Sequence, residues 1–201
     1  GVNMNPGAEP DDMVSLRIWL EPGRIVTLRH RRLMAVNDIR EAIEIQQGPK
    51  TLDDFLVQLV ERILSRMEES IGNLEECVDE LEESVIDQQQ SSLRSEIARQ
   101  RRMAIGLRRY IAPQRQAMTK LMSENVEWFS DLTRAHLREF ADRLTRYVED
   151  LDSARERASV TQDEVDSRAS ERMNRTMYLI SVYTAIFLPL GLITGLLGIN
   201  V

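Results

Sequence analysis

The chain has 201 residues, of which 26 are Lys or Arg and 33 are Asp or Glu, and its net charge is −7 at neutral pH. An acidic surface is a poor match for the phosphates of DNA or RNA, so we expect no nucleic-acid partner. One cysteine excludes an internal disulfide framework, and two separated histidines exclude a zinc site built from His and Cys ligands. Because the sequence also has no nucleophile–base pair and no phosphate loop, we expect neither an enzyme nor a bound cofactor.

Residues 1–50 predict the end of a cytoplasmic α/β domain. Residues 14–20, 25–28 and 33–36 have the composition of three short strands, which cannot close a core by themselves. We therefore expect the carboxyl-terminal part of an α/β domain whose beginning is missing. Asp38 and Glu41 have capping-box spacing and predict the start of a short helix. The apolar stretch at residues 14–20 is too short for a signal peptide and contains Arg17.

Residues 51–122 predict a long, charged, antiparallel helical hairpin. Thr51 is expected to cap a helix whose apolar stripe reaches Val85, and a second stripe begins after a polar break at residues 88–92. The first helix carries eight acidic residues between Glu68 and Glu83, whereas the second carries seven arginines. Opposite charges favour pairing of these two helices. The acidic face is either a solvated surface or a region that attracts cations from the cytoplasm.

Residues 123–176 predict a loop followed by a very long stalk helix. No Pro or Gly interrupts the helical pattern between Asp131 and Pro189, so one helix from about Asp131 to Gly198 would be roughly 100 Å long. Such a length exceeds a globular domain, so part of the helix must be a stalk. Four acidic residues of the stalk are candidates for a cytoplasmic regulatory metal site between protomers, or they only solvate the helix: Glu139, Asp142, Asp163 and Asp166.

Residues 177–201 predict a transmembrane helix, because no charged side chain occurs after Arg175 and about twenty-one apolar residues span a hydrocarbon core of roughly 30 Å. Arg168, Arg172 and Arg175 precede it and place that side in the cytoplasm. Small, hydroxylated or apolar residues recur on one face at steps of three or four: Met177, Ser181, Thr184, Leu188, Gly191 and Gly195. From spacing alone this face serves either close helix packing or the wall of a pore.

The string Thr184-Ala185-Ile186-Phe187-Leu188-Pro189-Leu190-Gly191-Leu192-Ile193-Thr194-Gly195-Leu196-Leu197-Gly198-Ile199-Asn200 resembles the first transmembrane helix of the CorA superfamily of divalent-cation transporters. That family carries Gly-Met-Asn at the pore entrance. The aliphatic Ile199 in the middle position is similar to the ZntB-like zinc-transport branch. The order of α/β domain, charged hairpin and stalk also resembles this family.

The resemblance implies a homopentamer in the cell inner membrane, with most of this chain in the cytoplasm and zinc or another divalent cation as the transported ion. It implies that Thr184, Leu188, Gly191 and Gly195 line the pore, that Met177 lies near the cytoplasmic gate, and that Gly198 and Asn200 belong to the extracytoplasmic mouth. A second span would follow Asn200, and the present residues do not include it. The alternatives are a magnesium or cobalt channel of the CorA type, and a structural or signalling stalk anchored by one span without transport.

Overall fold

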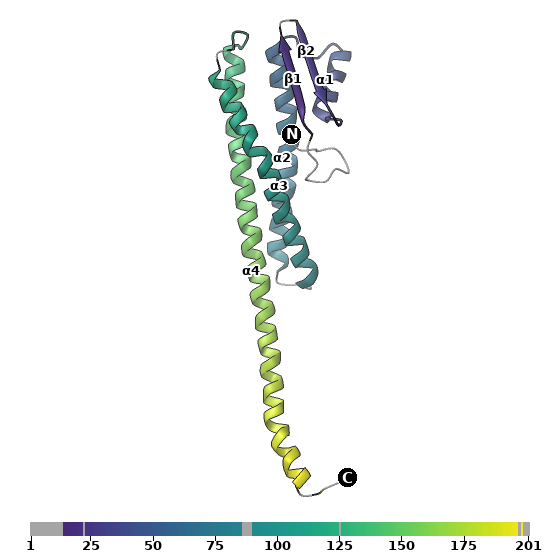
Figure 1. The fold of residues 1–201 in the computed structure, drawn as a ribbon, viewed down its shortest axis with the longest axis vertical. Helices are drawn as coiled ribbons and strands as arrows, with labels where there is room; N and C mark the ends of the chain where they lie inside the picture. The colour runs from purple at the N-terminus through teal and green to yellow at the C-terminus, as the bar shows by residue number, and fades with distance from the viewer. Residues whose placement is uncertain (1–13, 22, 86–89, 125, 197, 199–201) are drawn as a thin grey trace.

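The computed structural model describes residues 14–21, 23–85, 90–124, 126–196 and 198. Two strands and four helices follow one another in the order β1 (Leu16–Glu21), β2 (Arg24–Arg29), α1 (Met34–Glu44), α2 (Leu52–Ser84), α3 (Gln90–Ser123) and α4 (Asp131–Leu196). In Figure 1, the sheet and α1 lie on one side of α2, and α4 lies on the other. The expected combination of a small α/β part, a helical hairpin and a long stalk helix is confirmed.

The sheet is a two-stranded antiparallel hairpin in which Leu16 pairs with Arg29 and Trp19 pairs with Val26. Because side chains alternate across a strand, one face of β1 presents Leu16, Ile18 and Leu20 to a small apolar cluster. The buried members of this cluster come from the amino-terminal segment, α1 and α2: Val14, Leu33, Ala35, Ile39, Phe55 and Leu59. The cluster therefore fixes the sheet and α1 against the first turns of α2.

The third strand predicted at residues 33–36 is wrong, because α1 begins at Met34. Ala35 and Ile39 are both buried, and this spacing of four puts them on one helical face. A four-residue apolar run has no period that separates a strand from a helix. The predicted capping box also fails, since Asp38 lies inside α1 and its carboxylate instead receives the guanidinium of Arg66 in α2 at 2.7 Å.

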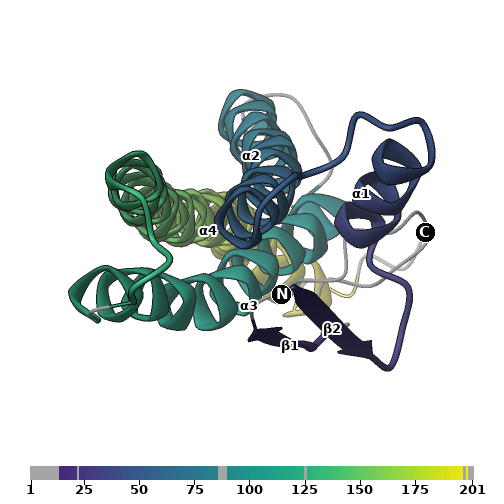
Figure 2. The same cartoon turned by 90° about the horizontal axis from the view of Figure 1, so that it is seen from above.

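Helices α2, α3 and α4 form a three-helix bundle with an apolar centre. Figure 1 shows α2 and α4 running in the same direction and α3 running against both, and Figure 2 shows the three axes from above. The largest fully buried side chains of the bundle come from all three helices: Leu64, Met67, Leu74, Ile97, Ile111, Leu137, Phe140, Leu144 and Leu151. The apolar stripes predicted for the hairpin and the stalk are therefore the faces that these helices bury against one another.

The amino-terminal ends of α2 and α4 are joined by a polar cluster around Asp53. The Thr51 side chain accepts a hydrogen bond from the Asp54 N–H, which confirms Thr51 as the cap of α2. The Asp53 carboxylate accepts from the hydroxyl of Ser130 at 3.1 Å and from that of Thr133 at 2.9 Å, 80 residues away. Hydrogen bonds from Thr51, and then from Thr133 and Ser130, lower the pKa of Asp53 from 3.8 to about 2 against the opposing effect of burial.

Replacement of this carboxylate should change the acid stability of the bundle. Because the folded-state pKa of Asp53 is depressed, its contribution is complete above pH 4 and is lost as the pH falls toward 2. Solvent screening reduces that contribution to about 1 kcal/mol. We expect Asp53→Asn to lower the free energy of unfolding by this amount at pH 7, and the difference from wild type to vanish near pH 2. Urea unfolding in metal-free buffer measures it, with Asp142→Asn on the exposed side of α4 as the control.

If the stability difference between wild type and Asp53→Asn did not change with pH, or if Asp142→Asn lowered the free energy of unfolding equally, the role assigned to the Asp53 carboxylate would be contradicted.

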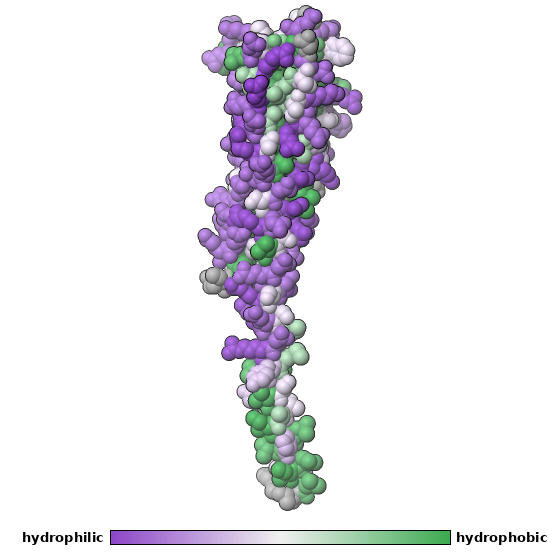
Figure 3. Space-filling view, turned by 90° about the vertical axis from the view of Figure 1, so that its left-hand side faces the viewer, coloured by the Kyte–Doolittle hydropathy of each residue, from purple (hydrophilic) through white to green (hydrophobic). Residues whose placement is uncertain are grey.

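The carboxyl-terminal part of α4 leaves the bundle. The last buried residue of α4 is Val165, and all residues described after Ala169 are exposed. At 1.5 Å per residue, the 66 residues of α4 extend about 100 Å, as the uninterrupted pattern predicts. Figure 3 shows the lower end of this helix as a predominantly hydrophobic surface below a hydrophilic body.

Candidate functional site

The apolar end of α4 is a membrane-spanning candidate by length and composition. Among the described residues, α4 is the one helix with an 18-residue window of this kind, and none of that window is buried within the chain. Residues 177–196 cover about 30 Å as a helix, which matches the hydrocarbon core of a bilayer. A soluble protein of this size would bury such a helix rather than expose it to water.

The predicted small-residue face is a continuous line along this segment. Met177, Ser181 and Thr184 occupy its first half, and Leu188, Gly191 and Gly195 occupy the second, at steps of four or three residues within one unbroken helix. The Thr184 hydroxyl donates to the carbonyl oxygen of Ile180 at 2.9 Å. Its only hydrogen is used within the helix, so its oxygen can still accept a hydrogen bond from outside.

The glycines of this face are not required by packing within the chain. A Cβ atom added at Gly191 or Gly195 would meet nothing within 4 Å. Gly198 is different, because its φ of +62° lies in the left-handed region that favours glycine. Ile199 and Asn200, to which the family resemblance assigns the pore mouth, lie outside the described residues. Contacts within the described residues therefore do not explain Gly191 and Gly195.

The four acidic residues of the stalk form two separate pairs along α4. Asp163 lies 21 positions after Asp142, about 32 Å along the helix, so the pairs cannot share a site within one chain. Glu139 lies 3.8 Å from His136, and Asp166 lies 2.6 Å from Arg94 of α3. Asp142 and Asp163 are exposed. The described residues contain no cluster of three His, Cys, Asp or Glu side chains that could hold a metal ion.

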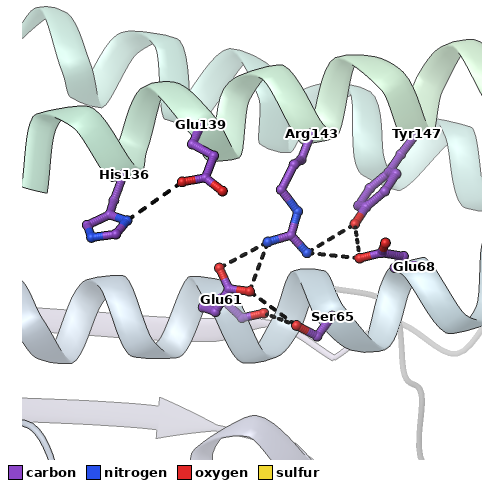
Figure 4. A network of polar contacts seen from close by, with 7 residues as sticks. All are labelled: Glu61, Ser65, Glu68, His136, Glu139, Arg143 and Tyr147. Atoms are coloured by element: carbon purple, nitrogen blue, oxygen red, sulfur yellow. Dashed lines mark hydrogen bonds and ion pairs between the residues drawn. The ribbon is translucent and has the colours of Figure 1, made fainter.

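A polar network around Arg143 joins α4 to α2 and was not anticipated from the sequence (Figure 4). The Arg143 guanidinium is 13% exposed and donates to both oxygens of Glu61 at 2.9 and 3.0 Å, and to Glu68 at 3.0 Å. The Tyr147 hydroxyl donates to Glu68 at 3.0 Å and accepts from Arg143 at 3.3 Å. Burial lowers the pKa of Arg143, but the hydrogen bonds to Glu61 and Tyr147 raise it by more.

A second arginine of α4, Arg157, repeats this arrangement near the carboxyl-terminal end of α2. Its guanidinium donates to Glu82 through Nε at 3.0 Å and through Nη2 at 2.5 Å, and also to Asp79. Hydrogen bonds to Glu82 and then Asp79 raise the pKa of Arg157. Together, Arg143 and Arg157 neutralise acidic residues in the first half, at the midpoint and near the carboxyl-terminal end of α2, and hold α2 parallel to α4.

The predicted partner of the acidic helix is therefore wrong. The acidic side chains of α2 pair with arginines of α4, and arginines of α3 also pair with α4, through Arg94 to Asp166 and Arg108 to Asp152, each at 2.6 Å. The hairpin is antiparallel as predicted, but its charges reach across to the stalk. The sequence did hold a signal, since Arg143 follows Phe140 and precedes Tyr147 on the buried stripe, where a cation needs partners.

Part of the acidic surface of α2 is not neutralised by arginines. Burial, followed by repulsion from Asp150 and Asp79, raises the pKa of Glu75, and burial followed by Glu149 raises that of Asp150. Four further glutamates are exposed and have no ion pair within the described part of the chain: Glu69, Glu76, Glu80 and Glu83. Attraction of cations by this surface stays a prediction.

The geometry defines a class: a helical bundle whose stalk helix continues into an exposed, membrane-length apolar segment. The chain belongs to the family of CorA-like Mg2+ transporter proteins, which it matches over residues 1–201. A transporter family is a family of membrane proteins, so membership agrees with the apolar segment as a candidate span, and it confirms the resemblance to the CorA superfamily. It also assigns the chain to a family of transporters rather than of enzymes.

Individual relatives agree with this family. The chain is 43% identical over 202 residues to the divalent cation transporter CmaX of Pseudomonas aeruginosa and 35% identical over 200 residues to the zinc transport protein ZntB of Yersinia enterocolitica. Each match covers 100% of the chain when rounded. The structure of full-length CmaX matches the whole chain with a TM-score of 0.91 at 42% identity. The chain spans 61% of the length of both relatives and 62% of the CmaX structure.

Proposed function

We propose that the protein containing this chain conducts divalent cations across the cell inner membrane through a homopentameric pore, with zinc as the first candidate ion. The observation that carries this proposal is the exposed apolar end of α4 with its line of small residues, in a chain of a cation-transporter family. Glycine and the hydroxylated side chains project little from the helix, so this face leaves room for an ion and suits the wall of a pore.

The chemistry of the face favours a hydrated ion. Residues 177–201 include no His, Cys, Asp or Glu, the side chains that bind dehydrated zinc. The Thr184 oxygen and the side-chain carbonyl of Asn200 can instead accept hydrogen bonds from the waters of a cation's first shell. Met177 and Leu188 on the same line would form apolar constrictions that close when they lose water.

The position of the charged residues supports the proposed orientation. Arg172 and Arg175 precede the apolar segment, and by the positive-inside rule this favours a cytoplasmic position for the bundle. In the proposed assembly, a second span follows Asn200 in the full-length protein. The acidic residues proposed to bind a cytoplasmic cation between protomers, and so to hold the pore closed, are Glu139, Asp142, Asp163 and Asp166. Of these, Asp166 would first have to leave its ion pair with Arg94 of the same chain.

Magnesium is the second candidate ion. The family description names Mg2+, and the CmaX relative is described as a divalent cation transporter, whereas ZntB proteins are described as zinc transporters. The zinc assignment rests on Ile199, which stands where magnesium-type members of the family carry methionine.

Uptake of radioactive zinc into vesicles containing the full-length protein tests the proposal. We expect Asn200→Ala to reduce uptake at least about tenfold, because a lost water-ordering contact at the mouth is worth roughly 1.4 kcal/mol or more. Asn73→Ala, at an exposed position of α2 away from the apolar segment, is the matched control. Absence of flux, or flux indifferent to Asn200→Ala, would favour the structural stalk. Competition by excess magnesium or cobalt would reassign the ion.

A further inference from the structure

One stripe of α4 changes character twice along its length. Leu151, Ala154, Ala158, Thr161 and Val165 are buried against the other helices of the bundle. The same steps of three and four continue with Arg168, Arg172 and Arg175, and then with Leu179, Val182 and Ile186. The stripe therefore passes from a buried seam through three arginines to bulky apolar side chains.

The first of these arginines belongs to the bundle. Arg168 donates to the carbonyl oxygen of Val85 at 3.2 Å, next to the end of α2, and to Glu164 at 2.7 Å. Arg172 and Arg175 lie beyond the bundle and are exposed. Within the described part of the chain, neither guanidinium lies within 4.0 Å of a carboxylate, and these two are the last charged residues of α4.

The depth of Arg172 and Arg175 matches the headgroup region of a bilayer. They precede Met177 by five and two residues, which corresponds to about 8 and 3 Å along the helix. The polar zone of a bilayer occupies roughly the 5–7 Å outside each edge of the hydrocarbon core. Tyr178 follows Met177 directly, at the level where amphipathic rings gather. Figure 3 shows the hydrophilic surface giving way to hydrophobic surface along this part of the molecule.

The two arginines also face away from the proposed path of the ion. At 100° per residue, the direction shared by Arg168, Arg172 and Arg175 lies about 170° from that of the line from Met177 to Gly195. Guanidinium groups on the pore side would repel a cation. On the opposite side they stand above Leu179, Val182 and Ile186, which are the side chains suited to contact with acyl chains.

We propose that Arg172 and Arg175 form a binding site for an anionic phospholipid of the cytoplasmic leaflet, a deepening of the proposed function since it requires the apolar end of α4 to be in a membrane. The planar guanidinium groups, one helical turn apart, receive the phosphate oxygens, and the acyl chains lie along the bulky stripe below. Charge complementarity favours this occupant over an apolar helix, and lipid phosphate reaches this depth in every membrane. The site ties the end of the bundle to the membrane surface.

Native mass spectrometry of the full-length protein in mild detergent tests the proposal, with phosphatidylglycerol or phosphatidylcholine added at equal concentration. Each arginine near an anionic surface strengthens binding to an anionic lipid, so we expect the wild type to bind phosphatidylglycerol about ten times more tightly than phosphatidylcholine. The preference should disappear in Arg172→Gln/Arg175→Gln and persist in Arg172→Lys/Arg175→Lys. The matched control, Arg102→Gln/Arg138→Gln, removes the same charge from exposed positions of α3 and α4 far from the apolar segment.

The result separates this proposal from the proposed function. Carbonate extraction of membranes first shows whether each variant is inserted, and a protein that is released refutes the membrane placement on which both depend. An inserted protein without the lipid preference, or with a preference that survives the glutamine double variant, overturns only the lipid site. A preference that survives the glutamine double variant would indicate that other residues of the protein bind the lipid.

Discussion

Replacing Phe140 by alanine should destabilise the bundle by about 3–5 kcal/mol, the largest stability effect we expect from a single substitution in this chain. Phe140 has 0% exposure and lies in the main apolar cluster with side chains of α2, α3 and α4. Its ring also stacks on His136, with the ring centroids 6.1 Å apart. Truncation removes the transfer free energy of the ring and leaves a cavity that three packed helices cannot close.

Urea unfolding of the chain in detergent, followed by the fluorescence of Trp128, measures this loss, since Trp128 packs against the same cluster. Leu132→Ala is the control, because Leu132 lies on the same helix and is 68% exposed, so its truncation should change stability by less than about 0.5 kcal/mol. Equal effects of the two substitutions would mean that α4 does not bury the face described here.

The long helices could be predicted because their signals extend over many residues. The apolar stripe of α2 repeats over 33 residues and begins at a Thr51 cap, and α4 runs for 66 residues without an early Pro or Gly. A helical period repeated over that many residues is incompatible with a strand or a loop. The exposed end of α4 was predictable for the same reason, since a run without charge can stay out of a core only in a membrane.

The short elements and the charge partners could not be predicted in the same way. Residues 33–36 are too few to show a period, and the helix there is decided by tertiary burial of Ala35 and Ile39. The acidic residues of α2 and the arginines of α3 are also compatible with ion pairs directly between these two helices, so the charge pattern alone does not identify α4 as the partner. The choice of α4 as partner depends on how three helices are arranged, and that follows from packing rather than from the order of charges.

The roles of the predicted pore residues are the hardest to derive from the structure of one chain. Thr184, Gly191 and Gly195 lie on one line, as the spacing predicted, but nothing in the described residues packs on that line. Their roles stay predictions. The open surroundings make them suitable for a test, because a larger side chain at either glycine meets no atom of the described residues.

Replacing Gly195 by leucine should abolish cation transport, with a loss of at least about a hundredfold, while the bundle stays intact. The new Cβ meets no atom within 4 Å in the chain, so the free energy of unfolding should change by less than about 0.5 kcal/mol. If the face lines a pore, each copy adds a bulky side chain to the same constriction, and the path loses the width and the water that a hydrated cation needs.

The size of the assembly in detergent then separates the two uses of this face. A pore wall predicts that Gly195→Leu keeps the wild-type oligomer and loses flux, whereas close helix packing predicts that the oligomer itself dissociates or changes size. Ile186→Phe is the matched control, because it enlarges a residue nine positions earlier, about half a turn around the helix, on the face assigned to lipid. Its flux should stay within about threefold of wild type if the two faces differ as proposed, since added apolar bulk toward acyl chains meets no fixed neighbour. Flux retained in Gly195→Leu would remove this line of residues from the ion path, whatever the oligomer does.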